Sequence, residues 1–480
     1  MTEATWIRLA RQLGEGRSTL AGLWGDSGAV HMALLDRGKA KISIASLECP
    51  SGQFPSVGRH HAPAQRLERA VRDLFGYEPI GSPDGRPWLD HGRWPVRHPL
   101  GIRSEASGAA RPYAFLKAAG EGLHQIPVGP VHAGIIEPGH FRFNANGETV
   151  VRLEERLGYA HKGVEALMSG TELNPAAKLA GRISGDSTVA YSIAFARAVE
   201  AALDLTIPAR AHWLRALLAE MERIANHLGD IGAICNDASF AIMHAHCGVL
   251  RERVLRAAEA CFGHRLMMDI VVPGGAAVDP GQSEFDDIRA LLKAIRIPFR
   301  KLVALYDNTA SLLDRTVGAG KLSSALARQF GCGGFVGRAS GRDFDARRDF
   351  PYPPYDELQF DVPVLSEGDV NARMWVRIRE VKQSLGLIDR ILDQMPPGDI
   401  RVEVAGAGET REGLALVEGF RGDILCWLRL GPSGLVERCH LRDPSWFQWP
   451  VLEAAIEGNI VADFPLCNKS FNCSYSGHDL

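Results

Sequence analysis

Glu137 and His140 have the side chains and the spacing that proton transfer could use. They stand three residues apart in Glu137-Pro138-Gly139-His140, and His140 opens a strand-like run. A carboxylate in a half-buried cleft can have its pKa raised toward neutrality and so pass protons, and an imidazole can supply a proton near neutral pH. The alternatives without chemistry are a loop glutamate in solvent and a structural histidine whose ring nitrogens are hydrogen-bonded.

Asp186 is a further candidate carboxylate, and with Ser187 it directly precedes the helix-like run 188–205. The side chains of both residue types accept hydrogen bonds from free N–H groups in a first helical turn, so capping is the favoured interpretation. The functional alternative is that Asp186 continues a proton path that begins at Glu137.

Three other histidines and one glycine-rich run lack the spacing of a metal or nucleotide site. His227 follows Glu222 by five residues, which is not the spacing of ligands on one helix face, so it is interpreted as helix packing. His244 and His246 are two residues apart and would point in different directions on a helix. The run 405–408 follows a strand-like segment but has neither a phosphate-binding loop nor a full dinucleotide fingerprint.

Composition restricts the class of protein. The 480 residues are 46% hydrophobic and 23% charged, which predicts a large core and two or more domains. Lys and Arg total 54 against 57 Asp and Glu, so nothing favours binding to nucleic acid. No leader-like start and no apolar run of membrane-spanning length is present, which predicts a chain that is neither secreted nor membrane-spanning. Nine cysteines without a Cys-x-x-Cys pair predict reduced, mostly buried thiols.

The patterning predicts an α+β protein. Strand-like alternation at 29–35 and 40–45 and a helical face from Leu67 to Phe75 indicate a small α+β domain over residues 1–110. The segment 81–87 is expected to end that helix. A linker is expected at 111–122, within the Pro-, Gly- and Arg-rich stretch 93–122, and a large domain at 123–480.

The large domain is expected to have three parts. Asn146-Gly147 between two strand-like runs predicts an N-terminal β-hairpin. Helical periodicity from 161 to 330, including a continuous apolar stripe from Trp213 to Leu228, predicts a central helical bundle. Short strands at 413–418, 423–430 and 436–441 predict a C-terminal β region.

Several short segments, ordered along most of the chain, are specific as a set although no single one is. They are Asp73–Gly76, Gly129–His132, Glu137–Arg142, His161–Glu165, Arg338–Gly341, Gly368–Val370, Asp443–Ser445 and Asp463–Leu466. Together they resemble the fused complex I 30-kDa-like and 49-kDa-like subunits of formate-hydrogenlyase-type, group 4 nickel–iron hydrogenases. The resemblance implies a complex I 30-kDa-like domain followed by a hydrogenase large subunit or 49-kDa-like domain.

In that family two cysteine pairs supply four thiolates to nickel, and two of them bridge to iron. Here the early pair falls on Ser184 and Ser187, and the late pair falls on Ser474 and Gly477. Cys473 lies one residue from the pattern. Serine hydroxyls are hard ligands that stay protonated at neutral pH, so they would not hold this metal pair. The chain therefore resembles the hydrogenase-related, Ehr-type members that lack the nickel–iron ligands.

The resemblance also implies roles for the candidate residues. Glu137 corresponds to a glutamate that resembles a proton gate beside the hydrogenase metal, and His140 to a complex I histidine that contacts the quinone headgroup. Leu173 stands near the place of the partner tyrosine in complex I, so the usual two-point grip on quinone is missing. Asp186 would fill part of the vacated metal pocket. The charged run 338–348 would form a buried salt-bridge network near that pocket. The alternative is a solvated charge run, which is the usual meaning of such a stretch.

The implied partners are a small iron–sulfur subunit like the complex I 20-kDa subunit, which would hold the cluster, and antiporter-like and other membrane subunits. The implied location is the cytoplasm, on the inner face of the cell membrane. The first hypothesis is an oxidoreductase subunit, not an active hydrogenase alone, whose former metal cavity passes protons or contacts quinone. The second is a catalytically silent scaffold. An open cavity lined by Glu137, His140 and Asp186 favours the first, and a filled apolar one favours the second.

Overall fold

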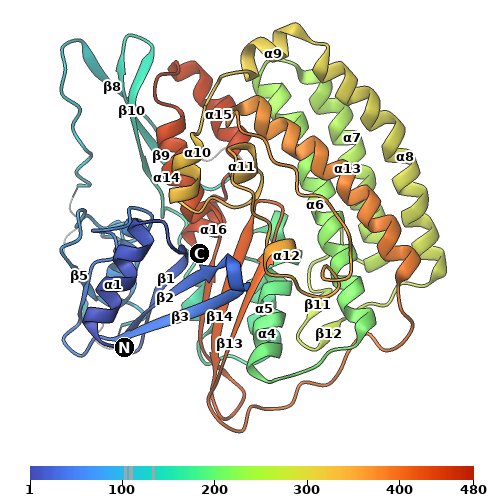
Figure 1. Cartoon of the computed structure of the whole chain (residues 1–480), viewed down its shortest axis with the longest axis horizontal. Coiled ribbons are helices and arrows are strands. Elements are labelled where there is room, and N and C mark those ends of the chain that lie inside the picture. The colour runs from blue at the N-terminus through green and yellow to red at the C-terminus, as the bar shows by residue number, and fades with distance from the viewer. Residues whose placement is uncertain (102–104, 107–111, 132–135) are drawn as a thin grey trace.

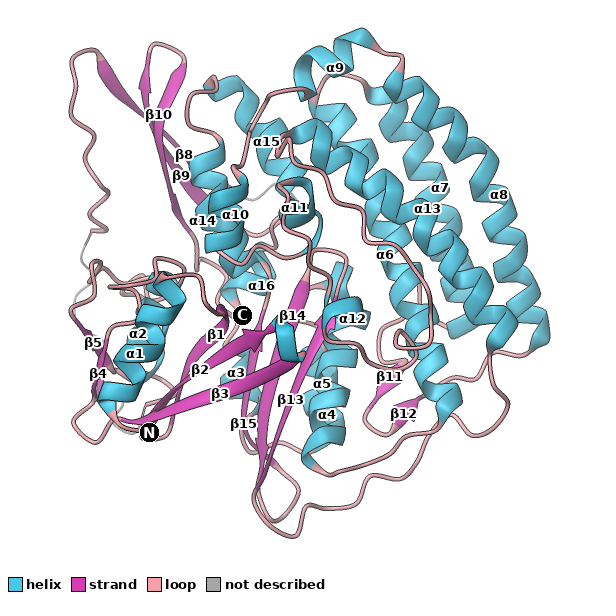
Figure 2. Cartoon of the chain, viewed as in Figure 1, coloured by secondary structure: helices cyan, strands magenta, loops and turns pink. Residues whose placement is uncertain are grey.

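The computed structural model describes the chain except for residues 102–104, 107–111 and 132–135. Figure 1 shows a small N-terminal unit, a projecting β-hairpin and a group of long helices at the opposite side of the molecule. Figure 2 shows helices and strands both well represented, so the predicted α+β class is confirmed. The predicted domain boundary at 110 and 111 and His132 of the sequence motif lie outside the described residues.

The N-terminal unit contains an antiparallel sheet of order β1-β2-β3, and α2 packs on β1. The predicted strands and the predicted helical face are present, but α2 ends before the segment 81–87. Gly76, with φ +75°, caps it by donating its N–H to the Arg72 carbonyl at 2.8 Å. The elements are α1 (Glu3–Gly14), β1 (Thr19–Asp26), β2 (Ala29–Asp36), β3 (Lys41–Glu48), β4 (Gln53–Pro55), α2 (Ala64–Phe75) and β5 (Glu78–Ile80).

The predicted hairpin is formed by β9 and β10, and β8 pairs with the other edge of β9 in the sheet of order β10-β9-β8. Asn146 pairs with Thr149 across the strands, so Gly147 and Glu148 form the two-residue turn, with Gly147 at φ +57°. A short strand pair, β6 (Val96–Arg97) and β7 (Glu105–Ala106), precedes this sheet. The sheet strands are β8 (Leu123–Val131), β9 (Gly139–Asn146) and β10 (Thr149–Arg156).

The central helical bundle is built around α6, which packs against α7 and α13, while α8 packs against α7 (Figure 1). The predicted apolar stripe from Trp213 to Leu228 lies on α6 and is buried. The helices of this part are α3 (Val164–Met168), α4 (Leu173–Ala180), α5 (Thr188–Ala202), α6 (Ala209–Asp237), α7 (Ala241–Phe262), α8 (Gln282–Asp307), α9 (Ala310–Thr316), α10 (Ser324–Gln329), α11 (Gly334–Ala339), α12 (Ala346–Asp349) and α13 (Val370–Gln394). A strand pair, β11 (Val271–Val272) with β12 (Gly275–Ala276), interrupts them.

The predicted C-terminal strands form the sheet β13-β14-β15, and α5 lies on it. The helix approaches closely because Gly413 has no side chain: a Cβ there would overlap the Ala198 carbonyl. Helices α14–α16 then return the chain end to the start of α5. The elements are β13 (Arg411–Glu418), β14 (Asp423–Leu430), β15 (Val436–Arg442), α14 (Ser445–Ala455), α15 (Phe464–Phe471) and α16 (Tyr475–Asp479).

The N-terminal unit and the large domain share a hydrophobic core. Trp24 and Trp427 meet between the sheets β1-β2-β3 and β13-β14-β15 with ring centroids 5.5 Å apart, and Arg442 donates to the Ala21 carbonyl at 2.6 Å. All nine cysteines are buried and unbridged, as the sequence predicts. Within the described ranges, no helix is long and apolar enough to cross a membrane.

Candidate functional site

The four sequence-matched ligand positions come together between the start of α5 and the last residues of the chain. The Oγ atoms of Ser184 and Ser474 lie 3.3 Å apart, although 290 residues separate them. Gly477 donates its N–H to Ser474 Oγ at 2.9 Å, and Ser187 completes the short helical turn that leads into α5. The fold thus gathers three hydroxyls and one residue without a side chain where the resemblance places four thiolates.

Asp186 lies among these hydroxyls and is paired with an arginine that the sequence did not single out. Its carboxylate accepts hydrogen bonds from Ser184 Oγ at 2.6 Å and from Arg421 Nη1 at 2.8 Å, and Arg421 also donates to Ser187 Oγ at 3.2 Å. Although burial opposes it, the Arg421 guanidinium lowers the pKa of Asp186 to about 2. Asp186 is therefore an ionised anchor for Arg421 at neutral pH.

The space beside Gly477 is filled by a second polar pair. Tyr191 donates its hydroxyl hydrogen to the Asp443 carboxylate at 2.5 Å, and both side chains are buried around Gly477. A Cβ at Gly477 would overlap the Asp443 carboxylate and lie 2.9 Å from the Tyr191 hydroxyl oxygen. The neighbouring Cys473 is buried, and burial raises the pKa of its thiol well above the ordinary value. The pocket is filled with polar groups that include Asp186, and so it is neither the open cavity nor the filled apolar one by which the two hypotheses were to be distinguished.

Glu222 on α6 provides the cap of α5 that the sequence assigned to Asp186 or Ser187. Its carboxylate accepts the N–H groups of Val189 at 2.7 Å and of Ala190 at 3.1 Å, whereas neither predicted residue caps with its side chain. Burial raises the pKa of Glu222 to about 8, and the negative charge of Asp186 contributes to that rise. Glu222 is thus a buried carboxylic acid that is mostly protonated at neutral pH.

Glu137 lies just before β9 and is half-buried. Its charge acts on the Lys162 ammonium: desolvation lowers the pKa of Lys162, and Glu137 partly offsets that change. Lys162 in turn donates to the Ile183 carbonyl at 2.8 Å and to the Ser476 hydroxyl. Because Ile183 adjoins Ser184, Lys162 connects the surroundings of Glu137 with the filled pocket.

His140, on β9, has both ring nitrogens engaged. Nδ1 lies 2.9 Å from the Gly129 carbonyl and therefore carries the hydrogen, and Arg142 Nε donates to Nε2 at 3.3 Å. Burial lowers the pKa of His140, which favours the neutral ring. These contacts fit the structural alternative for this histidine, and no contact between described residues joins it to Asp186.

The run 338–348 forms the buried ion network that the sequence predicts. Arg338, fully buried on α11, pairs with Glu380 at 2.6 Å, with Glu418 at 2.9 Å and with Asp345 at 3.4 Å. His227 packs inside the helical bundle, as expected, and lies 2.6 Å from Glu380 through Nε2. Among the residues that the structure describes, no three His, Cys, Asp or Glu side chains are arranged as metal ligands.

Two family profiles match this chain. The family described as "Respiratory-chain NADH dehydrogenase, 49 Kd subunit" matches residues 237–410, and the family described as "Nickel-dependent hydrogenase" matches residues 162–229. Formate hydrogenlyase subunit 5 of Escherichia coli (strain K12) is 33% identical over 437 residues, which cover 89% of this chain and 77% of that protein. The chain belongs to the family of complex I 49-kDa subunits and nickel–iron hydrogenase large subunits.

Two further proteins are similar to this chain. An NADH-quinone oxidoreductase subunit of Koribacter versatilis (strain Ellin345) is 28% identical over 379 residues, which cover 73% of this chain and 94% of that protein. A chain of the solved membrane-bound sulfane sulfur reductase, an archaeal respiratory membrane complex, is similar with a TM-score of 0.71 and 26% identity. The similarity covers 76% of this family member and all of that chain.

Sequence reasoning missed four residues that define the site in this family member: Tyr191, Glu222, Arg421 and Asp443. Arg421 and Asp443 lie in the C-terminal strand region, far along the chain from Asp186. Glu222 carried one available signal, because a charged residue within the apolar stripe of α6 must find a partner when that face is buried. The profile that matches 162–229 spans Glu222 together with Ser184 and Ser187.

Proposed function

We propose that this chain is the large subunit of a membrane-bound oxidoreductase complex related to complex I and to group 4 hydrogenases, and that it works without a nickel–iron centre. The observation that carries the proposal is the filled pocket. The residues present do not fit the metal pair, because hydroxyls replace soft thiolates and the Asp443 carboxylate lies where a side chain on residue 477 would begin.

The function that this geometry supports best is proton handling beside the former metal position. Glu137 receives protons at the edge, Lys162 connects it to Ser476 and Ile183, and Glu222 holds a proton at neutral pH. Asp186 keeps Arg421 in place and stays ionised. A quinone contact at His140 would require this ring to exchange its hydrogen bond with Arg142 for one with the quinone oxygen.

The partners proposed for the chain are a small iron–sulfur subunit, which holds the cluster, and antiporter-like membrane subunits. The chain itself would lie at the cytoplasmic face of the cell membrane. Support comes from relatives that are named as subunits of formate hydrogenlyase, membrane-bound hydrogenase and NADH-quinone oxidoreductase. The alternative is a silent scaffold, which the paired Asp186 and the fully engaged His140 favour.

Purification of the tagged chain from membranes in mild detergent tests the proposal. We expect the iron–sulfur and membrane subunits to co-purify, and the complex to evolve no hydrogen from reduced viologen. Isolation of the chain as a stable monomer under these conditions would contradict the proposed partners. Hydrogen evolution by the purified complex would contradict the proposed loss of the metal centre.

A further inference from the structure

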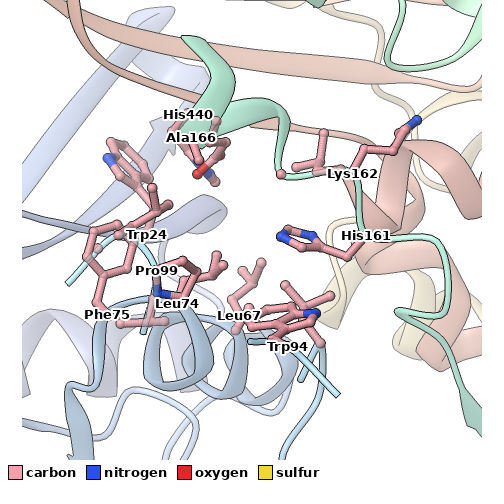
Figure 3. A pocket seen from close by; sticks show the side chains of 18 of the residues that line it. Trp24, Leu67, Leu74, Phe75, Trp94, Pro99, His161, Lys162, Ala166 and His440 are labelled. Carbon is pink, nitrogen blue, oxygen red and sulfur yellow. The ribbon is translucent and has the colours of Figure 1, made fainter. Parts of the chain in front are cut away.

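A half-enclosed cavity of about 410 Å³ lies between the N-terminal unit and the large domain, apart from the filled pocket. One wall comes from β1, α2 and the segment 89–100, and the other from the segment before α3, from β15 and from the C-terminal residues. Figure 3 shows Leu67, Leu74, Phe75, Trp94 and Pro99 on one side and His161, Ala166 and His440 facing them. The volume falls within the range of roughly 300–1,000 Å³ that small-molecule sites in proteins occupy.

Most polar and charged groups on the cavity wall already have hydrogen-bond or ion-pair partners within the chain. Glu165 is held by Arg438 and His440, each at 2.8 Å, and Arg438 lowers the pKa of Glu165 to about 2 although burial opposes it. The His478 ring accepts a hydrogen bond from Trp88 Nε1 at 3.1 Å. In Figure 3 the Lys162 ammonium points away from the cavity, consistent with its contact to the Ile183 carbonyl. These groups stabilise the wall and leave the cavity largely apolar.

His161 differs from these groups because only one of its two ring nitrogens has a hydrogen-bond partner among the described residues. Its Nδ1 lies 2.6 Å from the Asp479 carbonyl, so Nδ1 carries the hydrogen and Nε2 of the neutral ring carries a lone pair. Among the described residues, Nε2 has no hydrogen-bond partner. Figure 3 shows the ring directed into the cavity, and the Trp94 indole packs against it with centroids 4.8 Å apart. The cavity therefore presents one oriented hydrogen-bond acceptor within an apolar surface.

We propose that this cavity binds a lipophilic small molecule that carries a hydroxyl group at one end. The hydroxyl donates its hydrogen to Nε2 of His161, and the apolar body lies against Trp24, Leu74 and Phe75. A ligand with acceptor atoms only, such as an ether or ketone, offers nothing to the Nε2 lone pair and binds less well. The proposal does not depend on the proposed redox function, because the ligand contacts at His161, Trp24, Leu74 and Phe75 use none of the residues of the filled pocket.

The test is calorimetric titration of the purified full-length chain with 4-octylphenol and with 4-octylanisole, which differ in the phenolic hydrogen. We expect saturable binding of the phenol, and binding of the anisole that is weaker by roughly 3- to 10-fold, the effect of losing one hydrogen bond. In the His161→Phe protein, which keeps an aromatic ring beside Trp94, the two probes should bind equally. Equal affinities in the wild-type chain would overturn recognition of the hydroxyl.

Two filling variants and one control test the location. Ala166→Phe and Leu74→Trp fill the cavity from opposite walls, and each should weaken both probes by at least roughly tenfold through loss of apolar contact. Leu167→Phe is the control, because Leu167 is exposed and does not line the cavity. Circular dichroism identifies any variant that fails to fold, and the second filling variant then decides. Absence of saturable binding, or binding that both filling variants leave unchanged, would overturn the site.

Discussion

Replacement of Glu222 by Gln tests the assignment of a buried, protonated carboxylic acid at the start of α5. Gln has nearly the shape of a protonated Glu. Its carbonyl oxygen can accept one of the two N–H groups that Glu222 accepts, and its NH2 group cannot accept the other, a loss that does not change with pH. The substitution removes the titration and keeps the packing. Its effect on stability should therefore depend strongly on pH.

The direction of the change in stability with pH follows from the pKa of Glu222, which is 4.5 ordinarily and is raised to about 8 in the folded chain by burial. The folded state binds this proton more tightly than the unfolded state does, so the stabilisation is fully present below pH 4.5. It is lost as pH rises from 4.5 through 8. At about 1.4 kcal/mol for each pH unit, wild-type protein loses roughly 4–5 kcal/mol from this group across the window, and the Glu222→Gln chain loses none at this position.

Thermal unfolding of the wild-type and Glu222→Gln chains at pH 5 and at pH 8.5 measures this difference. At pH 5 we expect the wild-type chain to be the more stable one, because a protonated Glu keeps the hydrogen bond from the second N–H group that Gln cannot accept. At pH 8.5 the Glu222→Gln chain should gain several degrees relative to wild type. Glu259→Gln, on the exposed face of α7, is the control, and its unfolding temperature should equal that of wild type at both pH values. A stability difference between the Glu222→Gln and wild-type chains that stays constant with pH would refute a raised pKa at Glu222.

Three further predictions concern the buried ion network, the filled pocket and the proton path. Arg338→Met leaves Glu380, Glu418 and Asp345 without their shared cation. It should lower the free energy of unfolding, measured in urea, by about 3–5 kcal/mol. Arg348→Met, at the half-exposed end of the run, is the control and should lower it by under about 1 kcal/mol. Gly477→Ala pushes a methyl group into the Asp443 carboxylate and should lower the free energy of unfolding by about 1–3 kcal/mol. Gly386→Ala on α13, where the space is open, is the control and should not lower it. Glu137→Gln should leave assembly on native gels unchanged and lower proton-coupled turnover of the whole complex by roughly 10²–10⁴-fold, and wild-type turnover would favour the scaffold.

The local elements could be predicted from the sequence because their patterns are local. The alternation at 29–35, the stripe from Trp213 to Leu228 and the turn at Gly147 each depend on neighbours within a few residues. The end of α2 was placed wrongly, because a single Gly76 with positive φ ends the helix before the richer Gly and Pro segment. The packing of the N-terminal sheet on β13–β15 depends on contacts such as Trp24 with Trp427, which no local pattern encodes.

The candidate site could be predicted only in part, for the same reason. Ser184 and Ser474, which the sequence matched to the two cysteine pairs by their distance from Arg182 and from the last residue, lie beside one another, and their assignment to the metal ligands stays a prediction. Asp186 was expected in this pocket, but its pairing with Arg421 could not be foreseen, since Arg421 comes from the turn after β13 and reaches Asp186 across 235 residues. The cap of α5 by Glu222 is also a tertiary contact, and it left Asp186 free to pair with Arg421.

The central claim is that this family member carries no nickel–iron centre. Elemental analysis of the complex, purified from cells grown with added nickel, tests it most directly. Because hydroxyls and a filled pocket stand where the family resemblance places four thiolates, we predict nickel far below one atom per chain, with any iron accounted for by the proposed iron–sulfur partner. Near-equimolar nickel that resists dialysis against chelator would contradict the account.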